Sequence, residues 1–456
     1  MRLFDWRSLV VSSMMVGALA ANAETRPQYG GVLHVTMRAA PASLDPADST
    51  QPDTFGRRSL TMLMFDTLVT QDENGRVQPE LAVSWQSLPS SRGFQFRLRR
   101  GVRFHDGTPL SAENAAASLR EANPAWTVRA EADIVTIEPD ISSGELLAEL
   151  ALPRNAIVKR NAGGNPSGTG PFHIVDWQLG KKLTLMAEEI CWRGRPFLDG
   201  IEIEMGRSFR EQMTALELGK AELVEVAPEQ AHRVSQQGRR LASSPPLELL
   251  ALLFARDAAT REEKLLREAL ALSVERGSIR SVLLQGAGEP TASILPNWIS
   301  GYGFVFPTEA DLPRARQARE QVHTIPNWTL GYDGSDPVAR LLAERVALNA
   351  KDAGLLLQPT PAAAADLRLV RIPLASPDPW IVLADVAALG GTPLEKKQGS
   401  VEDLYASEQA LLTTRRVIPL FHLPVSYASA TTLKNWTLRP DGGWAVADAW
   451  LAVGKP

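Results

Sequence analysis

Apolar and polar positions along this chain follow two different periods, which predict a mixture of strands and helices. Residues 94–99 alternate apolar and polar side chains, the two-residue period of a half-buried strand. Residues 183–186 and 201–205 also predict strands, and residues 208–220 predict a helix. Alternation of this kind places the chain in the α/β class.

Short polar signals mark where several elements begin and end. Asp106-Gly107 predicts a tight turn, because glycine tolerates positive φ and aspartate can bond its own backbone. Ser111 then stands where a helix N-cap is expected. Gly354 predicts the end of a helix, and residues 401–413 predict a late helix.

Composition allows a large soluble protein and argues against one class of partner. The chain has 456 residues, of which 44% are hydrophobic and 22% charged, enough for two or three domains. Its net charge of -4 argues against a nucleic-acid-binding surface. The single cysteine, Cys191, has no partner for an internal disulfide, and we interpret it as a small buried hydrophobe.

The first residues have the pattern of a secretory signal peptide. Arg2 and Arg7 precede an uncharged stretch at 8–20, and Ala21-Asn22-Ala23 fits a small-x-small cleavage site. The stretch is shorter than the roughly 20 apolar residues of a membrane-spanning helix. No cysteine follows it, so a lipid anchor is not expected. We therefore predict a signal peptide at 1–23 and a periplasmic protein.

Candidate catalytic and metal-binding patterns are weak. His105 and Asp106 are adjacent on a predicted strand and would point to opposite faces, which disfavours a catalytic couple. The glycine-rich segment 163–170 lacks the lysine of a phosphate loop and is followed by Pro171. The six histidines are scattered without metal-ligand spacing. We expect no enzymatic activity, no metal site and no cofactor.

One segment carries a family resemblance. Residues 96–119 read FRLRRGVRFHDGTPLSAENAAASL, with a strand, an HDGTP turn and an SAEN helix start. This run resembles the extracellular solute-binding proteins of family 5, which deliver peptides, nickel complexes and some sugars or opines to ABC importers. Further blocks that resemble the family follow in order at 30–46, 63–85, 168–199, 266–296 and 418–422.

The resemblance implies a two-lobed periplasmic binding protein, of the cluster C type and type II-like, with an extra inserted subdomain. Lobe one would be discontinuous, and the chain would cross between lobes near 249–256 and 417–422. The expected division is lobe one at 24–57, 167–256 and 417–456, the inserted subdomain at 58–166, and lobe two at 257–416.

The resemblance also suggests ligand contacts. The loop after the first strand would offer backbone groups at Ala40, Ala42 and Ser43. In lobe two, Asp378 and Trp380 lie in a segment similar to the family's Asp-Pro segment beside the cleft. By residue type, Trp298, which lies near Tyr302, and Trp380 are the candidates for aromatic pocket walls.

Three features depart from the family pattern. Leu374 and Ala375 stand where peptide-binding relatives carry a carboxylate that pairs with the ligand's amine. The subdomain between 120 and 167 is shorter than in typical relatives, and the predicted helix 401–413 follows Trp380 almost at once. These departures fall where the ligand would be selected.

The sequence therefore predicts the periplasmic substrate-binding component of an ABC importer, acting as a monomer. It would capture a small solute, with a peptide as the leading candidate, and deliver it to a permease in the inner membrane. The alternative is a periplasmic sensor or scaffold that keeps this fold without serving transport. A secreted hydrolase would need a nucleophile and base that the sequence does not show.

Overall fold

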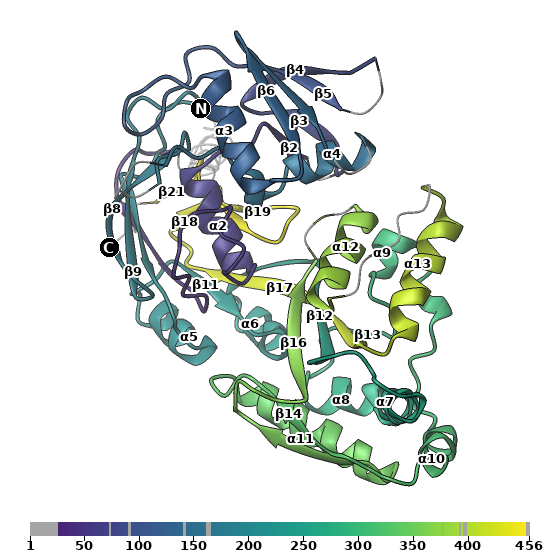
Figure 1. Cartoon of the computed structure of the whole chain (residues 1–456). Helices are drawn as coiled ribbons and strands as arrows, with labels where there is room; N and C mark the ends of the chain where they lie inside the picture. Colours follow the sequence, from purple (N-terminus) through teal and green to yellow (C-terminus); the bar gives the residue numbers. More distant parts are fainter. Residues whose placement is uncertain are drawn as a thin grey trace, which may run out of the picture.

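The structure is a computed structural model that describes residues 26–72, 74–89, 93–139, 143–160, 166–374, 376, 378–391, 394 and 399–452. Two lobes and a smaller subdomain make up the described chain (Figure 1). The predicted signal peptide, at 1–23, lies outside these residues. No described helix is both long and apolar enough to cross a membrane.

A single mixed sheet runs through both lobes. Among the described residues it has eleven strands, in the order β15-β14-β16-β12-β17-β11-β1-β10-β9-β8, with β13 paired to β17. The strands on the lobe-one side are β1 Val32–Thr36, β8 Phe172–Gln178, β9 Lys182–Ala187, β10 Gly200–Glu204 and β11 Leu223–Val226. Those on the lobe-two side are β13 Glu289–Pro290, β14 Asn327–Gly331, β15 Leu356–Thr360 and β16 Leu367–Pro373.

Two long antiparallel strands join the lobes, β12 Arg240–Phe254 and β17 Val417–Ser429. The lobe-one end of β17 pairs with β11, and the lobe-two end of β12 pairs with β16. Their pairing register shifts between Ser243 and Glu248, where β12 carries two prolines. Because proline has no N–H to donate to the neighbouring strand, it interrupts the hydrogen-bond ladder. This interruption lies where the strands pass from one lobe to the other.

The subdomain has its own four-stranded antiparallel sheet, in the order β4-β5-β7-β6. Its strands are β4 Ala82–Ser87, β5 Phe94–Leu98, β6 Thr127–Glu131 and β7 Ile134–Glu138. Helix α3 Ala112–Ala122, helix α4 Ser143–Leu150 and the 3-10 turn η1 Pro153–Asn155 accompany this sheet. A separate hydrophobic core, which includes Phe96, Leu119 and Val135, holds the subdomain together.

Helices cover both lobes. Lobe one carries α2 Phe55–Met64, α5 Phe209–Glu217, η2 Pro228–Gln230 and α6 Ala231–Gln236. Lobe two carries α7 Arg261–Ser273, α8 Arg276–Val282, α9 Asn297–Ser300, η3 Gly303–Val305, α10 Leu312–Glu320, α11 Pro337–Asp352, α12 Pro379–Leu389 and α13 Val401–Thr413. Short paired strands complete the described chain: β2 Val69–Gln71, β3 Val77–Pro79, β18 Leu433–Lys434, β19 Thr437–Leu438, β20 Trp444–Ala445 and β21 Trp450–Leu451.

The local predictions are confirmed where sequence signals were strongest. Strand β5 follows the alternation at 94–98, and the Ser111 side chain caps α3 by accepting from the Asn114 N–H. Helix α13 has the predicted bounds, and Gly354 follows α11 with a φ of 76°. The predicted lobe boundary at residue 58 falls inside α2, and the division of the chain into numbered parts stays a prediction.

Close packing explains the glycines before β8. A Cβ on Gly168 would lie 1.9 Å from the Met64 carbonyl oxygen, and one on Gly170 would lie 2.8 Å from the Leu63 carbonyl oxygen. Both positions therefore need glycine so that this loop can pass next to the backbone at the end of α2. The first glycines of the 163–170 segment lie outside the described residues.

Candidate functional site

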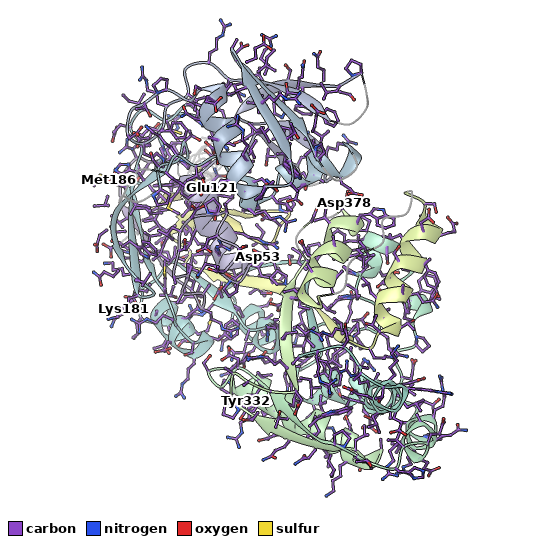
Figure 2. All side chains as sticks on the ribbon, viewed as in Figure 1. Asp53, Glu121, Lys181, Met186, Tyr332 and Asp378 are labelled. Carbon is purple, nitrogen blue, oxygen red and sulfur yellow. The ribbon has the colours of Figure 1, made fainter. Side chains whose placement is uncertain are left out.

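Two adjoining cavities lie where the lobes and the subdomain meet. The first has a volume of about 470 Å³ and the second about 720 Å³. Both are lined by Asp53, Arg371 and Pro373, so they share one boundary. Figure 2 labels Asp53 in the middle of the molecule, between the lobes. Cavities at the boundary between domains are common binding sites for small molecules.

The first cavity is lined by more carboxylates than guanidinium groups. It draws side chains from the end of β1, the starts of α2 and α5, the end of β11, the crossing strands, β16 and the loop before α11. Its acidic residues are Asp53, Glu211, Glu225, Glu248, Asp333 and Asp336, and its basic residues are Arg38, Arg207 and Arg371. This surplus favours a ligand that carries positive charge.

Arg371 stands at the boundary between the cavities. Its Nη1 lies 3.0 Å from Glu248 Oε2, and its Nη2 lies 3.7 Å from Asp336 Oδ2. Burial opposes its charge, but the surrounding carboxylates of Glu248, Asp336 and Glu229 outweigh burial and raise the pKa of Arg371. The guanidinium therefore stays charged and fixes two carboxylates from different strands and loops.

At two glutamates near the first cavity, the neighbouring groups do not offset the cost of burying a negative charge. Glu225 Oε2 accepts from the Arg38 N–H at 2.7 Å and from Gln212 Nε2 at 3.0 Å, yet burial raises the pKa of Glu225. Burial also raises the pKa of Glu229, whose Oε2 has no hydrogen-bond partner in the part of the chain that the structure describes. An approaching cation would favour the charged form of both groups.

The wall of the second cavity is more apolar. Its apolar side chains include Leu152, Leu253, Val370, Ile372 and Leu389. One side is the loop 46–53, which Arg57 holds by donating to the carbonyls of Asp45 and Asp48, each at 2.8 Å. The loop geometry is therefore set from within lobe one before any ligand arrives.

An ion pair joins the lobes beside the first cavity. Arg38 follows β1 in lobe one, and its Nη2 lies 2.9 Å from Oδ2 of Asp333, in the lobe-two loop before α11. The loop also contains Asp336, which caps α11 by accepting from the N–H groups of Val338 and Ala339. The described conformation thus has lobe-to-lobe contact on the rim of the first cavity.

The predicted backbone contacts lie close to this site. Ala40, Ala42 and Ser43 follow Arg38 and Ala39, which line the first cavity. The Ala42 N–H donates to Gln51 Oε1 at 2.8 Å, and Ser43 Oγ accepts from the Asp45 N–H. The Ala42 N–H and the Ser43 hydroxyl therefore both have hydrogen-bond partners within the loop.

The predicted aromatic residues have other neighbours. Trp298 Nε1 donates to the Pro246 carbonyl at 2.9 Å, where β12 is irregular, and 45% of the residue is exposed. Tyr302 is buried in a lobe-two core next to Tyr405, and Trp380 packs against the same core. These rings support lobe two.

Asp378 begins α12 as its N-cap. Its Oδ1 accepts from the Trp380 N–H at 2.9 Å and from the Ile381 N–H at 3.4 Å. None of the seven predicted site residues lines either of these two cavities in the described part of the chain. Their role in ligand binding stays a prediction.

The sequence reasoning missed the charged residues of the cleft. Glu248 and Arg371 each stand between apolar neighbours in their strands, a signal that a buried charge has a partner. Glu225 gives the same signal in β11. Their partners could not be assigned, because Glu248 and Arg371 lie 123 residues apart in sequence.

The catalytic, metal-binding and thiol candidates from the sequence lie outside these two cavities. His105 Nε2 bonds the Gly170 carbonyl at 3.0 Å, while Asp106 bonds Lys159, so the two side chains have separate partners. No group of three or more His, Cys, Asp or Glu side chains within the described ranges is arranged to hold a metal ion. Cys191 is half-buried, and burial raises its thiol pKa.

Comparison with known proteins gives one family match. The sequence model described as "Bacterial extracellular solute-binding proteins, family 5 Middle" matches residues 76–369. The nickel-binding protein NikA of Staphylococcus aureus is 24% identical over 279 residues, covering 58% of this chain and 55% of NikA. The oligopeptide-binding protein AppA of Bacillus subtilis is 23% identical over 320 residues, covering 63% of this chain and 57% of AppA. The matched part is thus little more than half of each relative.

A solved structure shows the same fold over almost the whole chain. The dipeptide-binding protein of Pseudoalteromonas sp. SM9913, in complex with Met-Leu, superimposes with a TM-score of 0.81 and 16% identity. The match covers 92% of this chain and 100% of that structure. The chain therefore has the fold of a two-lobed periplasmic binding protein.

Proposed function

Since the chain belongs to the bacterial extracellular solute-binding proteins of family 5, we propose that it is the periplasmic substrate-binding component of an ABC importer. It captures a small amine-bearing solute, with a peptide as the leading candidate, in the cleft between the lobes. The loaded protein then presents the solute to a permease in the inner membrane. It acts as a monomer and binds without turnover, in keeping with a family of binding proteins.

One observation carries the choice of solute. The first cavity combines an excess of carboxylates with an adjoining apolar cavity, so a ligand with a cationic end and an apolar body fits both. Glu225 and Glu229 would gain from a nearby positive charge, because burial raises the pKa of each. Relatives named for dipeptides and oligopeptides support this class.

The test begins with the solute that accompanies the natively expressed protein. Native mass spectrometry identifies it, and calorimetry then compares that compound with its N-acetylated form. We expect the acetylated form to bind about tenfold to hundredfold more weakly, because a charge-assisted pair is lost. Equal affinity for both forms would contradict recognition of the amine. A protein that carries no solute and responds to no peptide, sugar or nickel chelate would contradict transport and favour a sensor or scaffold.

Substitutions locate the binding groups. Glu225→Gln keeps the shape of a cavity-lining residue and removes its charge, so we expect weaker binding of a cationic solute. Glu217→Gln, on the exposed end of α5, is the matched control. Trp298→Ala and Trp380→Ala test the predicted stacking positions, and each should cost about 1 to 3 kcal/mol of binding if its ring contacts the solute.

A further inference from the structure

A second contact between separate parts of the chain lies in the wall of the second cavity. Arg154, in turn η1 of the subdomain, places Nη1 3.0 Å from both carboxylate oxygens of Asp385 on α12. Its Nε and Nη2 each lie 2.6 Å from one oxygen of Glu149, at the end of α4. One guanidinium therefore joins a subdomain carboxylate to a lobe-two carboxylate that lies 231 residues further along the chain.

The subdomain orients Arg154 independently of lobe two. Pro153 begins η1 and fixes the backbone just before the arginine. Asn155 is buried and donates from Nδ2 to the Glu149 backbone carbonyl at 2.7 Å and to Glu149 Oε1 at 2.8 Å. Asn123, which follows α3, donates to Asn155 Oδ1 at 2.8 Å. The turn and the carboxylate are thus held within the subdomain, which leaves Nη1 to reach Asp385.

An apolar contact crosses the same boundary. Ala148 of α4, Leu152 before η1 and Ile381 of α12 form a small buried cluster. Helix α12 lies below α4 in the view of Figure 1, and the two helices are in contact. The ion pair and the apolar cluster are separate observations of one interface between the subdomain and lobe two.

This interface forms part of the second cavity's wall. The subdomain contributes Leu152 and Arg154 to the lining, and α12 contributes Asp385, Ala388 and Leu389. A solute in this cavity would leave on this side only after the two surfaces had separated. The contact is therefore placed to control how long a solute stays.

We propose that the contact of Arg154 with Asp385, here called the clasp, holds the inserted subdomain against lobe two beside the second cavity and so retains the bound solute. The proposal rests on the proposed function for the existence of a solute, and it assigns the subdomain a part in binding. Arg154 is a positioning residue in this role, because its contacts are to Glu149 and Asp385.

Arg154 is the cation in direct contact with both carboxylates of this clasp, while Arg58 interacts with Asp385 from farther away. Glu149 and Asp385 both face Arg154, and Asp53 interacts with the same guanidinium. Asp378, at the start of α12, lies near enough to Glu149 for their charges to repel. Without Arg154, Glu149 and Asp385 lose the cation that joins them, so the attraction between the subdomain and lobe two weakens at this point. Loss of Asp385 alone leaves the Arg154–Glu149 pair intact.

Asp385→Asn is the primary test, because it breaks the ion pair between Arg154 and Asp385 and leaves the contacts within the subdomain in place. Arg154→Gln is the stronger variant, and Arg129→Gln, which breaks an exposed pair with Glu138 elsewhere in the subdomain, is the control. Hydrogen exchange of ligand-free protein reports the contact directly. We expect exchange at 379–389 to rise about tenfold in Asp385→Asn, to rise further in Arg154→Gln, and to stay at the wild-type rate in Arg129→Gln.

The second readout is the dissociation rate of the copurified solute, which we expect to rise about tenfold in Asp385→Asn. Unchanged exchange in both clasp variants would overturn the proposal. Faster exchange with an unchanged dissociation rate would overturn the retention role. Faster exchange in a protein that binds no solute at all would support the clasp and count against the proposed function, so the two ideas fail in distinguishable ways.

Discussion

Buried His422 predicts how this protein loses stability in acid. The residue lies in crossing strand β17, is 2% exposed, and its Nε2 donates to the Ile294 carbonyl at 3.0 Å. Burial lowers its pKa from 6.5 to about 4, because the charged ring would lose its hydration without gaining a counter-charge. The folded protein therefore holds this ring neutral at pH values where the unfolded chain binds a proton.

The sign and size of the stability change follow from the difference between the His422 pKa in the folded and the unfolded chain. Between pH 6.5 and about pH 4 the unfolded chain carries one more proton at His422, so the free energy of unfolding falls as the pH falls. Each pH unit in that window costs about 1.4 kcal/mol, which gives a total of about 3 kcal/mol. Above pH 6.5 the contribution is complete, and below about pH 4 this residue causes no further loss.

A variant isolates this contribution from the other titrating groups. His422→Gln keeps an N–H donor for the Ile294 carbonyl and cannot titrate, while nearby Glu408 stays present in both proteins. Burial raises the pKa of Glu408, so its protonation works in the opposite direction and cancels in the comparison. His323→Gln, at an exposed position, is the control.

The assay is urea unfolding at pH 7 and pH 4.5, with the histidine rings followed by NMR. We expect the stability advantage of the wild type over His422→Gln to shrink by about 2 to 3 kcal/mol on acidification, and the difference from His323→Gln to stay constant. Parallel pH profiles for the wild type and His422→Gln, or an NMR titration of His422 near pH 6.5, would refute the reasoning.

Three further substitutions test the packing, the helix start and the cleft charges. Gly168→Ala should lower stability by about 2 to 3 kcal/mol in urea unfolding, because the new Cβ meets the Met64 carbonyl, whereas Gly277→Ala has open space and should be neutral or slightly stabilising. Asp378→Ala removes the cap of α12 and should cost about 1 kcal/mol, most of which Asp378→Asn restores. Arg371→Gln leaves two carboxylates unpaired and should cost about 3 to 5 kcal/mol; an unchanged melting temperature would show that the cleft charges compensate one another without it.

Local signals predicted much of the backbone. The alternation at 94–98, the cap at Ser111 and the bounds of helix 401–413 were readable because strand period, capping and glycine placement act over a few residues. The family resemblance then implied two lobes, which the structure and the comparisons confirm. The sequence did not show the neighbours of the aromatic residues: Trp298 donates to a strand carbonyl and Tyr302 packs in a lobe-two core, and their role in ligand binding stays a prediction.

The sequence by itself determined the elements, their order and the family, because each of these depends on short-range pattern or on ordered motifs. Only the tertiary structure decided which charges share the cleft. Arg38 meets Asp333 across 295 residues, and Arg154 meets Asp385 across 231. The sequence shows these charged residues, but their partners depend on which elements and lobes come together. The arrangement of charges around the two cavities is therefore a property of the assembled lobes.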